Sequence, residues 1–250
     1  MRALFTVAAA AALVAGFAPA VGADAGESCR GSLTLQPIRT DDTTRRFAGV
    51  RAIIVRNESG DVAVDRSPAA RTTVATEACF SGPRPALSQR VRSGVLTISA
   101  SCPRPLAPLS ISVLEGPCRR DIQINAPAAV SPDLRTNVGD LSAEGIGGAT
   151  VLRAAAGDVS ATRSRARSIR ISSLAGSLDV GSQSKPRLIE ANGGAGKVSV
   201  TVPIDRYAVQ ASSSAGVVRS TGLTSDPSAA RKIEATTQSG DVTLTGLKGP

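Results

Sequence analysis

Four aspartates directly follow glycines in similar local sequences: Asp61, Asp140, Asp158 and Asp241. Stacked carboxylates at such positions would suit a calcium ladder, or an acid and base pair for cleaving glycans. The equivalent positions of neighbouring segments would interrupt that row, because they hold Ser177, Lys197 and Val217. We therefore expect the aspartates to be turn residues whose carboxylates accept backbone N–H groups.

A second candidate site is the run of alternate arginines Arg163, Arg165 and Arg167. If this segment is extended, the three guanidinium groups lie on one side and could bind phosphate or carboxylate groups. The alternative is a solvated outer face that discourages pairing between sheet edges. The sequence thus predicts a candidate anion-binding site at these three residues.

Catalytic and metal-binding residues are not indicated. The chain has no histidine, which excludes triads of the Ser-His-Asp kind. No pair of cysteines has the two-residue spacing of a zinc site. We expect no enzyme activity, no metal and no cofactor.

The four cysteines are Cys29, Cys79, Cys102 and Cys118. An even number of cysteines in an exported chain predicts two disulfides, and three pairings are open. We favour Cys102 with Cys118, which would close a proline-rich loop, and Cys29 with Cys79.

The first 23 residues have the pattern of a signal peptide. Arg2 is followed by an apolar run over residues 3–17, and Val21-Gly22-Ala23 offers small residues for cleavage after Ala23. Ala18-Pro19-Ala20 is a competing site. Cleavage after Ala23 would leave 227 of the 250 residues and change the net charge from +9 to +8. The mature protein is expected in the periplasm, outside the cell or at the cell surface, with no later membrane helix.

The basic charge could favour an anionic envelope polymer or a surface protein as partner. Solubility and codon bias are the alternative explanation of that charge. With no Trp, one Tyr and four Phe in the chain, stacking platforms for bases are scarce, so no nucleic acid is expected.

The sequence contains an internal repeat, which predicts the strands and turns that position the candidate aspartates and arginines. Glycines preceded by small residues recur at intervals of 18, 19, 20, 20 and 24 residues, at Gly139, Gly157, Gly176, Gly196, Gly216 and Gly240. Gly60 and Gly94 begin the same pattern earlier. The second residue after each glycine is apolar, and the fourth is apolar except at Ser220. Such alternation predicts a strand with one buried face.

A second strand precedes most of these glycines, with apolar residues seven and five positions before them, as at Ile169 and Ile171. These offsets are odd, whereas those after the glycine are even, so a straight strand could not bury both sets. The chain must therefore turn a corner at the glycine, where positive φ is tolerated. Stacked corners of this kind predict an all-β, single-domain β-solenoid, or β-helix, that is less regular at its N-terminal end. A β-sandwich remains the alternative, above all for the N-terminal third.

We expect residues 24–44 to lead into one domain over residues 45–250, with the regular repeat array at 137–247. The less regular strands are expected at Ala52–Arg56, Thr72–Cys79, Gly94–Ser101, Ser110–Leu114 and Asp121–Asn125.

The sequence resembles the bacterial putative adhesin family of unknown function with β-helical repeats. The resemblance is carried by Ile53 to Val64 (IIVRNESGDVAV), Gly94 to Ser99 (GVLTIS), Asp121 to Pro127 (DIQINAP) and the repeated turns that end in Ser239 to Leu244. It implies a β-helical fold and, loosely, adhesion, and it supplies no catalytic residues.

The expected function is a non-enzymatic, exported, adhesin-like binding or scaffolding module of the bacterial envelope or surface. A polysaccharide-active β-helix enzyme and a purely structural spacer are the alternatives. The outer faces distinguish the three functions: clustered acids favour the enzyme, an arginine stripe favours binding, and scattered charge favours the spacer.

Overall fold

The computed structural model describes residues 37–103 and 117–248. All of these residues lie in the second of two units of the chain, residues 32–250. Three expected features lie outside the described residues and stay predictions: the signal peptide, a disulfide at Cys29 and the strand at Ser110–Leu114.

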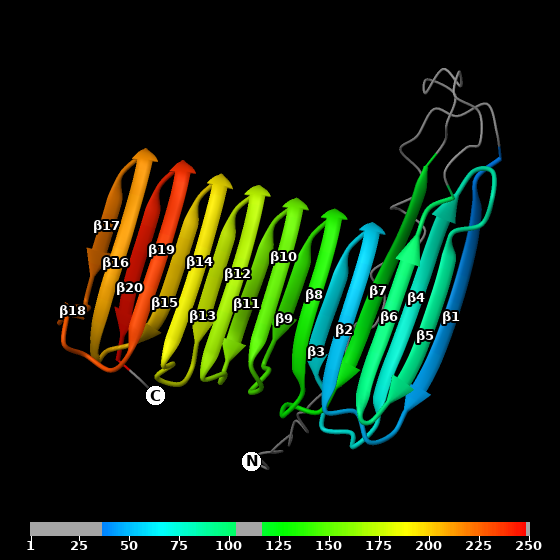
Figure 1. Ribbon diagram of the computed structural model, residues 1–250, viewed down its shortest axis with the longest axis horizontal. Coiled ribbons are helices and arrows are strands. Elements are labelled where there is room, and N and C mark those ends of the chain that lie inside the picture. The colour runs from blue at the N-terminus through cyan, green and yellow to red at the C-terminus, as the bar shows by residue number, and fades with distance from the viewer. Residues whose placement is uncertain (1–36, 104–116, 249–250) are drawn as a thin grey trace, which may run out of the picture. The chain divides into compact units, whose positions relative to one another are not determined.

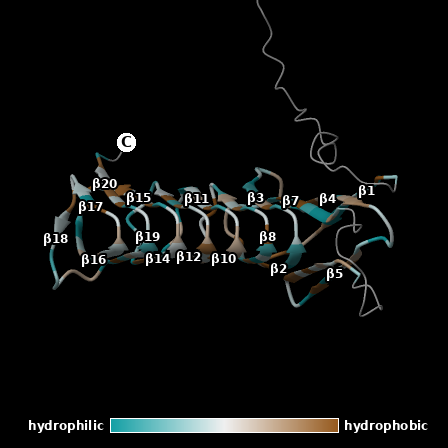
Figure 2. Cartoon of the chain, turned by 90° about the horizontal axis from the view of Figure 1, so that it is seen from above, coloured by the Kyte–Doolittle hydropathy of each residue, from teal (hydrophilic) through white to brown (hydrophobic). Residues whose placement is uncertain are grey.

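The described part of the chain is all-β and contains no helix. Its strands form two ten-stranded sheets that face one another, as in a β-sandwich (Figures 1 and 2). We call the first of them sheet A, and its strands follow in the order β1 (Arg39–Phe47), β4 (Thr72–Phe80), β7 (Cys118–Ala126), β3 (Val62–Arg66), β9 (Leu141–Glu144), β11 (Val159–Ser164), β13 (Leu178–Ser182), β15 (Val198–Pro203), β20 (Val242–Leu247) and β17 (Val218–Thr221). We call the second sheet B, and its strands follow in the order β18 (Thr224–Ser225), β16 (Arg206–Ala215), β19 (Lys232–Ser239), β14 (Leu188–Ala195), β12 (Ser168–Ala175), β10 (Thr150–Ala156), β8 (Ser131–Val138), β2 (Ala52–Ser59), β6 (Val95–Ser101) and β5 (Ala86–Arg92).

The expected corners are confirmed. At six of the expected corner glycines, the strand before the glycine belongs to sheet B and the strand after it to sheet A, as for β10 and β11 around Gly157. Both sets of apolar side chains therefore point into the space between the sheets. Ile169 and Ile171 from sheet B and Leu178 and Val180 from sheet A are all at most 2% exposed.

Glycine is required at these corners by conformation and by space. Six of the expected corner glycines have φ between 117° and 144°: Gly60, Gly139, Gly157, Gly176, Gly196 and Gly240. A Cβ on Gly157 would lie 2.0 Å from the carbonyl oxygen of Gly139 in the neighbouring corner. Because the corners stack this closely, any larger residue would push neighbouring backbones apart.

Gly94 is a correction to the expected pattern. It does not link the two sheets, but lies with Ser93 in the turn between β5 and β6, which pair antiparallel within sheet B. The apolar residues Leu96 and Ile98 after it are buried as expected. Two residues of positive φ, at 49° and 76°, suit a tight hairpin turn, so the local sequence resembled a corner without forming one.

The N-terminal third also pairs differently from the rest. β1 with β4, β4 with β7 and β5 with β6 are antiparallel, whereas the other neighbouring strands of the described residues, such as β2 with β8 and β3 with β9, run parallel. β1 begins at Arg39, within the segment 24–44 that was expected to lead into the domain, and runs on to Phe47. The sheets are thus mixed.

Neighbours in the sheets do not follow the order of the sequence. The last two strands, β19 and β20, insert between the pair β14 and β15 and the pair β16 and β17. This leaves β17 at the edge of sheet A. Val218, expected to be buried as the second residue after Gly216, is 42% exposed, because no other strand of the described residues lies beyond β17 in sheet A.

The described residues include no helix that could span a membrane.

Candidate functional site

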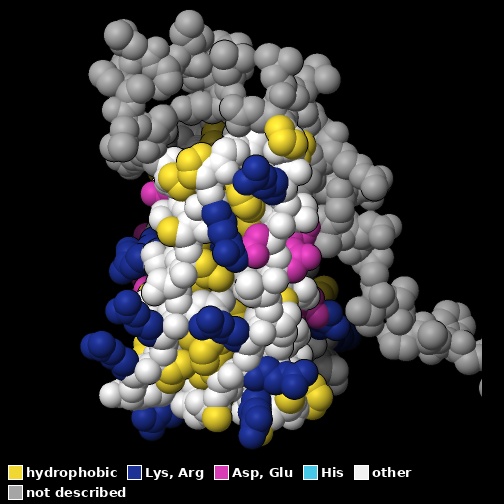
Figure 3. Space-filling model, turned by 90° about the vertical axis from the view of Figure 1, so that its right-hand side faces the viewer, with side chains coloured by type: hydrophobic (Ala, Val, Ile, Leu, Met, Phe, Trp, Pro, Cys, Tyr) yellow, Lys and Arg dark blue, Asp and Glu magenta, His cyan; other side chains and the backbone are white. Residues whose placement is uncertain are grey.

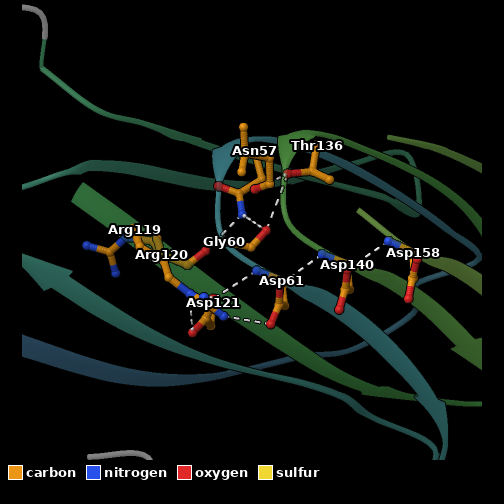
Figure 4. A network of polar contacts seen from close by, with 10 residues as sticks. Asn57, Gly60, Asp61, Arg119, Arg120, Asp121, Thr136, Asp140 and Asp158 are labelled. Carbon is orange, nitrogen blue, oxygen red and sulfur yellow. Dashed lines mark hydrogen bonds and ion pairs between the residues drawn. The ribbon is translucent and has the colours of Figure 1, made fainter. Parts of the chain in front are cut away.

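The corner aspartates accept backbone N–H groups, as expected, but from neighbouring corners. The carboxylate of Asp61 accepts the N–H of Asp140, that of Asp140 accepts the N–H of Asp158, and that of Asp158 accepts the N–H of Ser177, at 2.8, 2.8 and 2.7 Å. Asp121 accepts the N–H of Asp61 at 2.8 Å and so extends the row by one strand (Figure 4). The row stops at Ser177, which has no carboxylate. These carboxylates are thus structural links between corners.

A second polar row runs on the inner side of the corners. Asn57 donates to the carbonyl oxygens of Gly60 and Arg120 at 3.0 and 2.8 Å (Figure 4). Thr136 and Ser173 donate to the corner glycine carbonyls of neighbouring strand pairs at 3.3 and 2.9 Å. These bonds satisfy carbonyl groups that the turn removes from the sheets.

Arg119 binds the end of the aspartate row. Its guanidinium donates to Asp121 at 2.7 Å and to Asp61 at 2.6 Å. Within the described residues, no group of three or more Asp, Glu, Cys or His side chains could hold a metal ion.

The favoured pairing of Cys102 with Cys118 is confirmed by a disulfide between them. Cys79 is disulfide-bonded as well. Its expected partner, Cys29, lies outside the described residues, so that pairing stays a prediction.

The three arginines proposed for anion binding are all exposed, but they do not form one extended face. β11 ends at Ser164, and Arg163 has φ of 49° where the pairing of β11 with β13 is irregular. Arg163 forms an ion pair with Glu144, and Arg163 and Arg165 line a hollow of about 300 Å³. Arg167 does not line it. The irregular backbone thus groups two of the three, and anion binding there stays a prediction.

A more regular row of arginines lies on the outer face of sheet B. Arg56, Arg135 and Arg153 are register partners on the adjacent strands β2, β8 and β10, and all three are exposed. Neighbouring strands are about 4.8 Å apart, so the side chains form a stripe. Asp133 lies 3.3 Å from Arg135 and 3.5 Å from Arg153, and so holds these two guanidinium groups in place. We call these three arginines the arginine row.

The arginine row borders a hollow. Arg56 and Arg135 line a space of about 310 Å³ together with Asn137 and Glu58. The row was not predicted from the sequence, because its members are far apart in the chain. Its signal is present nonetheless, since Arg56, Arg135 and Arg153 each stand four positions before a corner glycine.

The fold resembles solved structures of bacterial proteins. A putative cell adhesion protein from Clostridium sporogenes is 12% identical, with a TM-score of 0.51 over 84% of this chain and 100% of that chain. A putative adhesin from Bacteroides fragilis is 15% identical, with a TM-score of 0.46 over 83% and 97%. A putative adhesin from Parabacteroides merdae is 11% identical, with a TM-score of 0.32 over 86% and 98%. The first of these likenesses shows a common fold.

No family model and no curated protein matches the chain.

Proposed function

We propose that the mature chain is an exported, non-enzymatic, adhesin-like binding or scaffolding module of the bacterial envelope or surface. Two observations support export: the signal-peptide pattern of residues 1–23 and the disulfide between Cys102 and Cys118, a bond that persists in oxidising compartments. The fold shared with the putative cell adhesion protein from Clostridium sporogenes supports the adhesin-like class.

We also propose that the array from β8 onward is a β-solenoid. Apart from the two-residue strand β18, its strands alternate between the two sheets, and neighbours within each sheet are parallel, with equivalent residues such as Leu178 and Val198 in register. This arrangement supports one coil per repeat, as in solenoid proteins.

The observation that carries the binding function is the arginine row. Three guanidinium groups at strand spacing match the repeated charges of an anionic polymer better than scattered charge would. Each exposed contact contributes about 1 kcal/mol or less and is screened by salt. We therefore expect weak, multivalent binding of an anionic envelope polymer.

The test is retention of the mature protein on dextran sulfate and alginate columns over a salt gradient. One triple variant replaces the arginine row, with Arg56→Ser, Arg135→Ser and Arg153→Ser. The other replaces the cluster expected from sequence, with Arg163→Ser, Arg165→Ser and Arg167→Ser. Both lose the same formal charge and must keep the circular dichroism of the wild type.

We expect the arginine-row variant to elute at lower salt than the other variant. Equal loss by the two variants would show that only total charge matters and would overturn the arginine row as a site. A wild-type protein that is not retained on either column would contradict the binding function and favour the structural spacer.

A further inference from the structure

A polar pocket of about 400 Å³ lies at the N-terminal end of the two sheets, between their edge strands β1 and β5. Among the described residues, no further pair of strands covers the space between the sheets at this end. Its polar lining is Asp41, Thr43, Arg45, Arg84, Gln89 and Arg120. Figure 3 looks at this end of the sheets, where basic side chains outnumber acidic ones. We call this the end pocket.

The end pocket carries an excess of positive charge. Three arginines and one aspartate line it, a net formal charge of +2. Asp41 pairs with Arg84 at 2.5 Å and with Arg120 at 3.3 Å, and these arginines hold the pKa of the Asp41 carboxyl below its usual range. Arg45 has no ion pair within the described part of the chain. Asp41 therefore neutralises one of the three guanidinium groups.

Arg120 is built into the pocket wall. It is 1% exposed, and its guanidinium donates to the Thr76 hydroxyl at 3.2 Å and to the Pro85 carbonyl at 3.3 Å. Its Nε has no hydrogen-bond partner within the described residues. Buried polar groups are normally paired and guanidinium groups bind oxyanions strongly, so an anion in the pocket would account for this unused donor.

Gln89 supplies a second unused polar group. Both the oxygen and the nitrogen of its side-chain amide are buried without a hydrogen-bond partner in the described part of the structure. Buried amides are normally paired. An amide offers both a donor and an acceptor, which suits a hydroxyl group beside the anion.

We propose that the end pocket binds a small hydrophilic anion that carries one carboxylate or phosphate group next to hydroxyl groups. The arginines bind the oxyanion, and Gln89 binds a hydroxyl group. The site shares no residue with the arginine row, so it is independent of the polymer binding proposed above.

Calorimetric titration of the mature protein at fixed ionic strength tests this proposal. The probes are inorganic phosphate, glucose 6-phosphate, glucuronate and, as the neutral control, glucose. We expect saturable binding of one equivalent of an anionic probe and none of glucose. Comparison of phosphate with glucuronate shows whether the pocket prefers a phosphate or a carboxylate group. Tighter binding of glucose 6-phosphate than of phosphate would support recognition of the hydroxyl groups, and equal binding would overturn that part.

Arg45→Gln and Arg46→Gln form a matched pair of variants. The two residues are neighbours on β1, and only Arg45 lines the end pocket. We expect Arg45→Gln to weaken binding at least tenfold and Arg46→Gln to leave it unchanged. If Arg45→Gln does not fold, Arg45→Lys serves in its place, since it keeps the charge but loses the planar fork.

Three results would overturn the end pocket as an anion site: no binding of any anionic probe, binding of glucose as tight as that of the anions, or equal weakening by the changes at Arg45 and Arg46. If the wild-type protein binds none of the small anions but is retained normally on the anionic columns, only the end-pocket proposal is refuted. If the wild-type protein binds a small anion in the end pocket but is not retained on the columns, only the polymer proposal is refuted.

Discussion

The carboxylate of Asp61 accepts a 2.8 Å hydrogen bond from the backbone N–H of Asp140, a residue 79 positions later in the chain. Between them the chain forms β3 to β8 and then returns to place β9 beside β3. The bond therefore links two corners that are neighbours in space although 79 residues separate the two aspartates in the chain. It also shows what the aspartates do: they hold one corner in register with the next.

The aspartate row should contribute to stability at each link. Asp158→Ala removes the acceptor of the Ser177 N–H, and we expect a loss of about 0.5–1.5 kcal/mol in the free energy of unfolding by urea. Asp179→Ala is the matched control, because Asp179 is exposed on β13 and its carboxylate has no hydrogen bond within the described residues. Equal effects of the two changes would contradict a structural role of the row.

The corner glycines should not tolerate a side chain. Gly157 has φ of 140°, so Gly157→Ala combines backbone strain with a clash against the Gly139 carbonyl. The strain alone should cost about 1–3 kcal/mol in the free energy of unfolding. Gly181→Ala is the control, since the nearest atom to its added Cβ would be 3.7 Å away, and it should change stability by no more than about 0.5 kcal/mol. A stable Gly157→Ala variant would refute the close stacking of corners.

The disulfide between Cys102 and Cys118 should stabilise the N-terminal third. It joins cysteines 16 residues apart, and closing a loop of this size contributes roughly 3 kcal/mol through the entropy of the unfolded chain. The double variant Cys102→Ser and Cys118→Ser should lose about that much in urea unfolding. This variant, unlike added reductant, leaves the bond of Cys79 intact. An unchanged midpoint and slope would contradict the prediction.

Tyr207 provides a spectroscopic test of the core. It is the only tyrosine in a chain without tryptophan, it is 0% exposed, and its hydroxyl donates to the Pro203 carbonyl at 3.0 Å. Burial raises the pKa of the phenol to about 12. The phenolate absorbance of the native protein should therefore rise near pH 12, while in the urea-unfolded protein it rises near its usual value of about 10.

The same pKa shift predicts the direction of alkaline instability. The unfolded chain releases the phenol proton first, so this group costs no stability below about pH 10 and destabilises the fold as the pH rises from about 10 to about 12. Tyr207→Phe should remove this contribution to the pH dependence. Native titration near pH 10 would show that the hydroxyl is exposed to water.

The sequence by itself determined the local structure of the repeats. Apolar residues at odd offsets before a glycine and even offsets after it require a corner, because neighbouring side chains in a strand alternate between faces. The same pattern predicted the burial of Ile169 and Leu178, among others, and the cysteine spacing favoured the observed pairing of Cys102 with Cys118. Each of these results depends on residues that are close in sequence.

The tertiary structure alone decided which repeats are neighbours. Strands of similar pattern can replace one another in a parallel sheet at little cost, so local sequence does not fix that β20 inserts between β15 and β17, or that β3 lies beside β9. This choice brings Arg56 beside Arg135, exposes Val218 at an edge, and leaves Arg45, Gln89 and Arg120 around an open end of the core. Both of the binding surfaces proposed here depend on such non-local pairing, because each combines side chains from strands that the sequence keeps far apart.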